Sequence, residues 1–427
     1  MKIAVHIPKL NKTEGGSFFY IKILIDFFSK YKGEHEFIFF NTDSSILSFN
    51  KSSEEKKYYY FDTDKAESKL NNELKSRGWK RTLWFFDVIE YRLKIKLFSF
   101  LKYQLQSAIY TLREEFITGE FMEFITLNKI DCVYYTHPLY CYNPDVPFIC
   151  TVWDLGHLTQ NIFPEISGNG QYAKRHDYYN KILPRAFKII RESEYGKMEL
   201  KQYYNIADDK IVVFPQFPGE IVNMAINDEE IKNILDSFEL TGEKFIFYPA
   251  QFWPHKNHYN LLLASNYLKT VGVSVKLVLV GSDKGNIDYI KEVIKSLNLE
   301  KDVKLLGFIE DKELFALYKT ALAMIYPSFL GPTNMPVVES LALGCPLLCS
   351  NLEGHIEQAG NAAIFFDPKD YKDIANAIIK ICNDDSLRKQ LIINGYEQFE
   401  KKSNLNINIK YIITAFDELE CIRKCWK

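Results

Sequence analysis

Short apolar runs of strand length alternate with longer amphipathic stretches of helix length along most of this 427-residue chain. In the second half, segments such as 260–269 and 287–297 separate the runs FIFYPA, VKLVLVG, VKLLG, ALAMIYP, PLLCS and AAIFF. In the first half, KIAVHIP, EFIFF, CVYY, FICTV and FKII supply further strand-like runs. Such alternation is typical of βα units, whose strands form a parallel sheet. The sequence therefore predicts an α/β protein with two doubly wound, Rossmann-like domains.

The length of the chain also favours two domains, because a single hydrophobic core rarely grows beyond about 250–300 residues. Turn residues in PQFPGE and the polar segment that follows, up to residue 243, mark the junction between the two sets of strands. We predict a first domain over residues 1–220, with a basic, aromatic, helical insertion at about residues 66–118. A second domain is predicted over residues 221–403, followed by a helix over residues 404–427 that packs back on the first domain.

The composition is that of an ordinary globular protein. It has 47% hydrophobic and 25% charged residues, which excludes disordered and collagen-like chains. A net charge of −2 argues against general nucleic-acid binding. The eight cysteines contain no CxxC pair, so buried free thiols in a reducing cytoplasm are expected. The opening MKIAVHIPKL predicts a strand rather than a signal peptide, and no apolar run approaches the ~20 residues of a membrane span.

The stretch PSFLGPTNMPVVESLALGCPLLCS places a turn-rich loop directly before a helix. Pro336 suits the first helical position, and the unpaired N–H groups at such a helix start favour an anion such as a pyrophosphate. Glu339 lies one turn into the helix, where an ionised carboxylate can accept hydrogen bonds from both vicinal hydroxyls of a ribose. The alternative is a carboxylate that only complements the helix dipole.

The loop AQFWPHKNH follows a strand and contains Lys256 between His255 and His258. Lysine is a natural partner for a phosphate, with a solvated surface lysine as the alternative. The histidines lack the HExxH spacing or a carboxylate cluster, so no metal site is predicted. Gly16 belongs to a glycine pair that would allow a backbone to approach a ligand or would form a simple tight turn. Neither a GxGxxG nor a GxxxxGK[ST] motif is present.

Residues 75–103 carry eight basic and two acidic residues, interleaved with tryptophan and phenylalanine. Lys80, Arg81 and Trp84 represent this pattern, which suits an anionic membrane interface or a lipid-pyrophosphate acceptor. An amphipathic helix that packs its aromatic side chains on the first domain is an equal alternative. Single-stranded nucleic acid ranks third, because the whole chain is slightly acidic.

Three stretches of the second half, GFIEDKELFALYKTALAMIYPS, PVVESLALGCPLLCS and EQAGNAAIFFDP, resemble the donor-binding domain of the retaining glycosyltransferases of family 4. The resemblance is strongest over residues 244–384 and implies the two-domain GT-B fold, in which two Rossmann-like domains face a central cleft. The first domain would bind the acceptor and the second the nucleotide sugar. No cofactor and no metal would be needed.

The resemblance also implies roles for individual residues. Glu339 would bind the ribose of the nucleotide sugar, and Lys256 its phosphates. A histidine of the first domain would approach the donor sugar, and His157 is the candidate. The remaining donor-binding candidates implied by the resemblance or by their loops are Gly16, Gln251, Gly307, Phe308, Thr333, Asn334 and Met335.

Two positions depart from the family pattern. The first glutamate of the family's usual pair falls on Gly331, and the usual arginine before the phosphate lysine falls on Gln251. The loops GPTN and PHKNH nevertheless resemble a subset found among bacterial surface-polysaccharide enzymes, including those that make O-antigen and lipopolysaccharide. We therefore interpret these changes as a variant site.

The expected function is transfer of a hexose or deoxyhexose, with mannose as the first choice, to a lipid-linked or growing glycan. The expected partners are a nucleotide-sugar donor, a glycan or lipid-pyrophosphate-linked acceptor and the inner face of a membrane, with no nucleic acid. The expected location is the cytoplasm, with peripheral association at the inner membrane. One alternative is a catalytically silent GT-B protein that binds a glycan or a partner enzyme, and another is a nucleotide-sugar epimerase.

Overall fold

A computed structural model describes residues 1–8, 16–41, 58–60, 71–78, 118–137, 141 and 145–425. The predicted insertion falls largely outside these residues, and so do Lys80, Arg81 and Trp84. The chain forms two compact units. One comprises Met1–Lys9 and Phe28–Cys150, and the other comprises Leu10–Phe27 and Thr151–Lys427.

The first unit is built on parallel strands in the order β3-β2-β1-β4-β5. Their bounds are β1 (Lys2–His6), β2 (Glu36–Asn41), β3 (Tyr58–Tyr60), β4 (Cys132–Tyr135) and β5 (Phe148–Thr151). Residues 71–76 and 118–127 are helical. Ile3, Ala4 and Val5 of β1 are all buried, as expected for an inner strand of a parallel sheet, which is covered on both faces.

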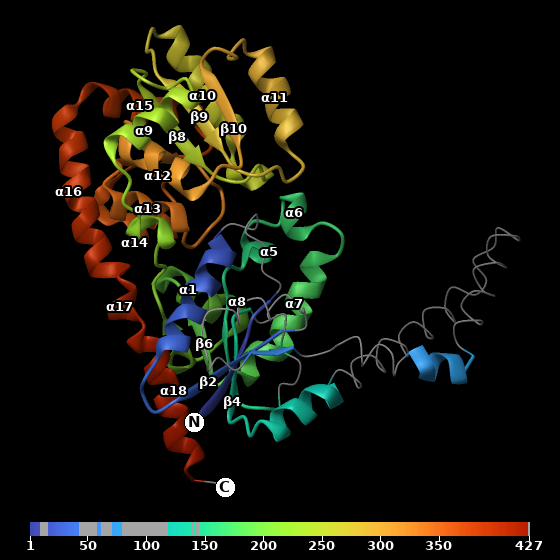
Figure 1. Cartoon of the computed structure of the whole chain (residues 1–427). Helices are drawn as coiled ribbons and strands as arrows, with labels where there is room; N and C mark the ends of the chain where they lie inside the picture. The colour runs from blue at the N-terminus through green and yellow to red at the C-terminus, as the bar shows by residue number, and fades with distance from the viewer. Residues whose placement is uncertain are drawn as a thin grey trace, which may run out of the picture. The chain divides into compact units, whose positions relative to one another are not determined.

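The second unit contains a six-stranded parallel sheet in the order β10-β9-β8-β11-β12-β13 (Figure 1). Its strands are β8 (Phe245–Pro249), β9 (Lys276–Val280), β10 (Val303–Gly307), β11 (Ala323–Tyr326), β12 (Leu347–Ser350) and β13 (Ala363–Phe366). The parallel pair β6 (Lys188–Arg191) and β7 (Ile211–Val213) belongs to the same unit. Every residue of β11 and β12 is buried, so these apolar runs form the centre of the core.

Helices connect the strands of the second unit, and α10 contacts both α11 and α15. In chain order the helices are α1 (Gly16–Lys30), most of which belongs to this unit, α5 (Gly156–Thr159), α6 (Pro164–Ser167), α7 (Gln171–Ile182), α8 (Glu194–Tyr204), α9 (Asp228–Ser237), α10 (His258–Thr270), α11 (Ile287–Ser296), α12 (Asp311–Thr320), α13 (Met335–Leu343), α14 (Glu353–Ala359), α15 (Tyr371–Asn383), α16 (Asp385–Lys402), α17 (Leu405–Asn408) and α18 (Lys410–Arg423).

Local sequence explains the limits of α13, the helix that matters most for the site. Pro336 lies in its first turn, where its missing N–H is no loss. Gly344 ends the helix with φ 71°, a left-handed conformation that glycine adopts without steric cost. Because all strands of this sheet are parallel, the loops after β8, β9, β10 and β11 emerge at the same edge. The loop before α13 is one of them.

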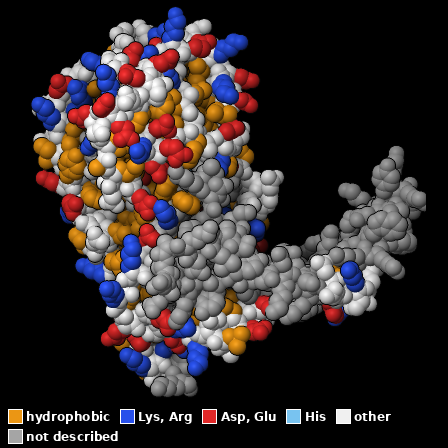
Figure 2. Space-filling view, viewed as in Figure 1, with side chains coloured by type: hydrophobic (Ala, Val, Ile, Leu, Met, Phe, Trp, Pro, Cys, Tyr) orange, Lys and Arg blue, Asp and Glu red, His pale blue; other side chains and the backbone are white. Residues whose placement is uncertain are grey.

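The last helix, α18, lies against β7. Lys188 Nζ of β6 forms an ion pair with Glu418 of α18, with an N–O distance of 2.6 Å. The domain limits expected from the sequence stay a prediction. Among the described residues, no helix has both the length and the apolar character needed to cross a bilayer. Acidic and basic side chains are interspersed on the visible described surface (Figure 2).

Substitution of Gly354 tests whether α14 packs closely against the loop before α13. A Cβ atom at this position would lie 2.0 Å from the backbone oxygen of Pro332. We expect Gly354→Ala to destabilise the protein by about 1–3 kcal/mol, because neither backbone can give way cheaply. The control is Gly119→Ala, which adds a Cβ into open space on a helical segment. Thermal unfolding should show a lower midpoint for the first variant alone, and equal midpoints would contradict the close packing.

Candidate functional site

A cavity of about 520 Å³ opens at the loop edge of the six-stranded sheet, and all of its lining residues belong to the second unit. Parts of the chain far apart in sequence meet there: the start of α1, the segment after β5, the end of β6 and the loops of the six-stranded sheet. Its polar lining residues include Asp154, Glu165, Arg175, Glu192, Gln216, Gln251, His255, Lys256, Asp311, Thr333, Asn334 and Glu339.

Lys256 lies at the end of a short 3-10 turn between β8 and α10. Its Nζ donates to the Tyr326 hydroxyl at 2.8 Å and to Asn334 Oδ1 at 3.4 Å. Among the described residues no carboxylate lies within ion-pair distance of this Nζ. Burial lowers the pKa of Lys256 to about 8, a shift that Asp154 opposes. Among the described residues this partly buried cation therefore has no acidic partner, which suits an anionic ligand.

The Asn334 side chain is fixed by neutral groups on both sides. Its Oδ1 accepts from the Tyr326 hydroxyl at 2.7 Å, and its Nδ2 lies 2.7 Å from His355 Nε2. Burial lowers the pKa of His355 to about 3, so the imidazole is neutral and can accept at Nε2 while Nδ1–H faces Ser350 Oγ at 2.9 Å. His355 thus positions the amide that contacts Lys256.

The backbone of Asn334 is held as well. Its N–H donates to Gln358 Oε1 and its carbonyl accepts from Gln358 Nε2, both at 3.0 Å. Gly331, three residues earlier, has φ 133°, and a Cβ atom there would lie 2.2 Å from Asn334 Nδ2. No side chain fits at position 331 in this loop, which gives a physical reason for the glycine noted in the sequence.

Glu339 lines the cavity but has only 7% of its surface exposed. Its Oε1 accepts from the Gly219 N–H at 3.2 Å and its Oε2 from the Tyr318 hydroxyl at 3.0 Å. Burial raises the pKa of Glu339 to about 7, although both hydrogen bonds oppose the shift. Gly219 must lack a side chain, because a Cβ atom would lie 2.8 Å from Glu339 Oε1. These partners lie outside α13, so the carboxylate does more than complement the helix dipole.

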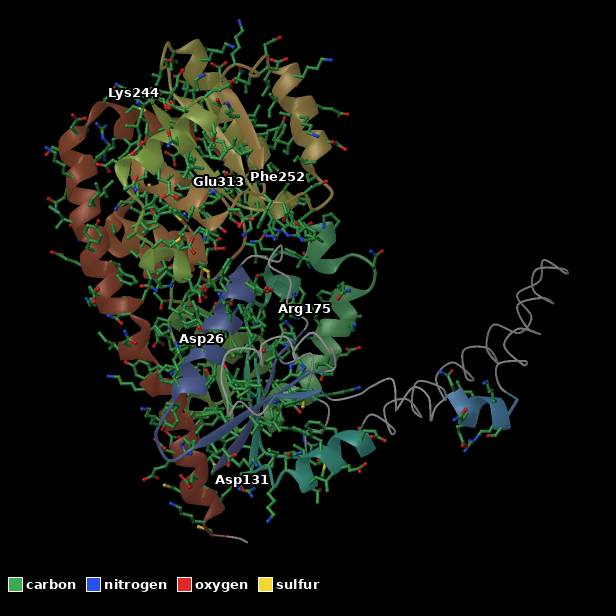
Figure 3. The ribbon with its side chains drawn as sticks, viewed as in Figure 1. Asp26, Asp131, Arg175, Lys244, Phe252 and Glu313 are labelled. Carbon is green, nitrogen blue, oxygen red and sulfur yellow. The ribbon has the colours of Figure 1, made fainter. Side chains whose placement is uncertain are left out.

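Asp154 and Arg175 form an ion pair in the cavity wall, which was not predicted from the sequence. Arg175 lies on α7 (Figure 3) and donates from one terminal nitrogen to Asp154 Oδ1 and to the Asp154 carbonyl, at 3.0 Å each. Asp154 also accepts from the Gly156 N–H at 2.7 Å. Burial alone would raise the pKa of Asp154, but Arg175 and the Gly156 N–H outweigh it and lower that pKa to about 2. The only local signal was the Asp-x-Gly turn pattern.

His157 is not among the residues that line the cavity. Its side chain is fully buried, with Nε2 2.9 Å from the Tyr204 hydroxyl and the ring edge-on to Tyr179. Burial, with a contribution from Arg175, lowers the pKa of His157 to about 4. The structure brings Lys256 and Glu339 together in one cavity, but it does not bring His157 to them. From the same segment, Trp153 and Asp154 line the cavity instead.

Most of the other predicted donor-site residues line the cavity: Gly16, Gln251, Phe308, Thr333, Asn334 and Met335. Gly307 ends β10 with φ 68° and is not a lining residue, whereas Phe308 beside it is 46% exposed. Gln251 accepts from Trp253 Nε1 at 3.0 Å. The sequence did not point to Gly219, Tyr318 or His355 as site residues, because their contacts with the site are set by tertiary packing.

Two further carboxylates line the cavity, Glu192, which is buried, and Glu165, which is partly buried. Glu165 Oε1 accepts from both the backbone N–H and Nδ1 of His255, at 3.0 and 2.7 Å. Glu192 Oε2 accepts from the Thr333 hydroxyl at 2.6 Å. Burial raises the pKa of Glu192 to about 7, and Thr333 and Arg191 oppose that shift. Neither acid stood out in the sequence, since each follows no recognisable motif.

Comparison with known proteins shows which family the residues around the cavity resemble. Residues 229–398 match the model of the family described as glycosyl transferases group 1. This part of the chain belongs to that family. The predicted family is thereby confirmed over the cavity's sheet and loops, with Lys256 and Glu339 inside the matched range.

The curated relatives include several bacterial glycosyltransferases. O-antigen chain mannosyltransferase B of Escherichia coli is 26% identical over 52% of this chain and 59% of its own length. The serotype-specific mannosyltransferase WbdA of the same species is 27% identical over 62% of this chain and 34% of its own length. The chain thus spans only about a third to three fifths of these relatives.

Solved structures show the fold. HepE of Anabaena, in complex with UDP and glucose, has a TM-score of 0.67 with 16% identity, covering 98% of this chain and 99% of that one. WaaG, a glycosyltransferase involved in lipopolysaccharide biosynthesis, has a TM-score of 0.64 with 10% identity, covering 97% and 98%. The chain has the two-domain α/β GT-B fold that the sequence predicted.

The lowered pKa of Lys256 allows us to predict how anion binding depends on pH. We expect the affinity for inorganic pyrophosphate to fall as the pH rises through about 8, because the lysine then loses the proton that the anion requires. Calorimetric titration at several pH values between roughly 6.5 and 9.5, on both sides of that pKa, measures the affinity. Lys256→Arg is the comparison, since an arginine stays charged over this range. Parallel profiles for the two proteins would contradict the assignment, because the titration of pyrophosphate itself is common to both.

Proposed function

We propose that this chain is a retaining hexosyltransferase. It would move a hexose or deoxyhexose from a nucleotide-diphosphate sugar to a lipid-linked or growing glycan in bacterial surface-polysaccharide synthesis. The observation that carries the proposal is the meeting of Lys256, the start of α13 and Glu339 in the lining of one cavity. This combination offers a cation, a helix N-terminus and a hydrogen-bonding carboxylate to one ligand.

The nucleotide would bind through three contacts. Lys256 and the positive end of the α13 dipole would take the diphosphate, since a helix N-terminus and an ammonium both favour anions. Glu339 would accept hydrogen bonds from ribose hydroxyls with the lone pairs that Gly219 and Tyr318 leave free. Phe308, 46% exposed at the cavity, offers a face for the base.

In the reaction, the bond between the sugar C1 and the β-phosphate oxygen breaks, and a bond between C1 and an acceptor hydroxyl oxygen forms on the same face. The departing phosphate accepts the proton of that hydroxyl. Lys256 and the α13 amides lower the barrier by stabilising the charge that develops on the leaving group. Gln251, the loop Thr333–Met335 and Gly16 would orient the donor, and no metal would take part. Because His157 is enclosed by Tyr179 and Tyr204, it would act on the cavity through this packing.

The names of the relatives support the choice of sugar and acceptor. Two are named O-antigen chain mannosyltransferases. A relative from Campylobacter jejuni, 28% identical over 58% of this chain and 60% of its own length, is named for an acceptor linked to diphospho-undecaprenol. We therefore place mannose first among donor sugars and a lipid-diphosphate among acceptors.

The remaining parts of the proposal concern the whole protein. Residues 1–220 would bind the acceptor and residues 221–403 the nucleotide sugar, with the segment around Lys80, Arg81 and Trp84 toward the acceptor or membrane. The protein would work on the cytoplasmic side, at the inner face of the membrane. The eight cysteines without a CxxC pair suit a reducing cytoplasm.

The donor site is tested by calorimetric titration with UDP, GDP, ADP and dTDP. We expect one nucleotide to bind selectively, and Lys256→Ala to weaken it by about 10- to 100-fold, the effect of losing a hydrogen bond to a charged group. Lys291→Ala is the matched control, because Lys291 is exposed on α11, outside the cavity, and forms an ion pair with Asp288. Binding of no nucleotide by the unmodified protein would favour the silent, partner-binding alternative.

Transfer itself is tested by nucleotide release from GDP-mannose and UDP-glucose with and without a lipid-diphosphate glycan acceptor. Lys256→Ala and Glu339→Ala should each abolish acceptor-dependent release, because the first loses leaving-group stabilisation and the second the ribose contact. Full activity in both variants would remove the site assignment. Conversion of the sugar nucleotide to an epimer without acceptor would instead indicate an epimerase.

A further inference from the structure

Position 331 in the loop before α13 cannot present a side chain to a bound ligand. The backbone there has φ 133°, and a Cβ atom would lie 2.2 Å from Asn334 Nδ2. The Asn334 amide cannot move aside easily, since it is bonded to Tyr326 and His355. Any carboxylate that recognises the ligand beyond the diphosphate must therefore come from another part of the cavity wall.

Glu192 is such a carboxylate. It follows β6, lines the cavity and is only 6% exposed. Its Oε2 accepts from the Thr333 hydroxyl at 2.6 Å, which places it against the same loop, two residues from Gly331. Its Oε1 is buried and has no hydrogen-bond partner among the residues that the structure describes. Burying an oxygen of this kind without a partner costs free energy, so a ligand that supplies the missing donor would be bound selectively.

The backbone around Glu192 is well anchored. Ser193 is the N-cap of α8 and its hydroxyl accepts from the Gly196 N–H at 3.0 Å. Arg191, the preceding residue, is fully buried, donates to the Val152 carbonyl at 2.8 Å and forms an ion pair with Glu199. Glu192 is thus held between two fixed residues, which is what recognition of one hydroxyl group requires.

The other acids of the wall are less suited to this role. Asp154 is paired with Arg175, and both oxygens of Glu339 already accept hydrogen bonds. Glu165 also has a buried oxygen without a partner. However, Glu165 contacts His255, the residue beside the phosphate-binding Lys256, whereas Glu192 contacts Thr333 on the loop before α13.

We propose that Glu192 recognises the sugar of the nucleotide-sugar donor, with Oε1 accepting a hydrogen bond from one sugar hydroxyl. The inference rests on the proposed function and adds to it a residue that determines sugar specificity. The ligand class is a hexose that carries a hydroxyl within reach of Oε1. A sugar without that hydroxyl would leave the carboxylate oxygen unpaired and would be rejected.

The experiment compares a nucleoside diphosphate with its sugar derivative. The unmodified protein, Glu192→Gln and Glu192→Ala are titrated with GDP and GDP-mannose, and with UDP and UDP-glucose. Both variants should bind the preferred nucleotide within about twofold of the unmodified protein, while affinity for its sugar derivative falls by about 10-fold or more in Glu192→Ala. Thr333→Val removes the hydrogen bond to Glu192 Oε2. It should also lower the affinity for the sugar derivative, but by a smaller factor.

Glu194→Gln is the matched control, because Glu194 lies two residues along on the same turn with an exposed side chain. It should change neither affinity. Thermal unfolding of each variant checks the fold, and Glu192→Gln keeps the size of the side chain if Glu192→Ala does not fold.

The outcomes distinguish a failure of the role proposed for Glu192 from a failure of the proposed function. If the variants lose nucleotide and nucleotide sugar equally, or neither, Glu192 does not recognise the sugar, although the donor site stands. If the unmodified protein binds no nucleotide, the proposed function fails and the role of Glu192 fails with it.

Discussion

The partly buried ammonium of Lys256 is the constraint on which the cavity depends. A lysine can be taken out of water when a carboxylate compensates its charge, but here its contacts are the Tyr326 hydroxyl and the Asn334 amide. These neutral acceptors do not compensate the charge of the ammonium, and burial lowers the pKa of Lys256 to about 8. An anion would compensate that charge. The site is therefore built around a group that the protein itself does not provide.

Close backbone approaches fix the geometry around this charge. Gly354 lets α14 pack directly on the Pro332 carbonyl, and Gly219 lets an N–H reach Glu339. Gly331 leaves room for the Asn334 amide. Each glycine brings two segments to a distance that a Cβ atom would prevent. The rigidity of the loop before α13 thus follows from small residues as much as from the hydrogen bonds of Gln358 and His355.

The sequence predicted what depends on local pattern. The apolar runs 245–250 and 321–327 contain β8 and β11, and the proline at 336 marked the start of α13. Lys256 and Glu339 could be selected because each sits in a loop or helix start next to a strand. His157 could not be judged in this way, since only tertiary packing shows that its imidazole faces Tyr204. Glu192 and Arg175 were missed for the same reason, because their partners Thr333 and Asp154 lie far away in sequence.

The five carboxylates that line the cavity would repel an anionic ligand if all of them carried a full charge, and the structure reduces that charge at three of them in two ways. Arg175 neutralises Asp154, which keeps a low pKa and stays ionised as half of a pair. Glu192 and Glu339 instead have pKa values raised by burial to about 7, so a substantial fraction of each is protonated near neutral pH. Glu165 keeps its charge through the hydrogen bonds from His255. A diphosphate that enters beside Lys256 would raise the pKa of nearby carboxyl groups further. The cavity wall can therefore become less negative as the anion binds. The oxygens of Glu192 and Glu339 stay in place as hydrogen-bonding groups.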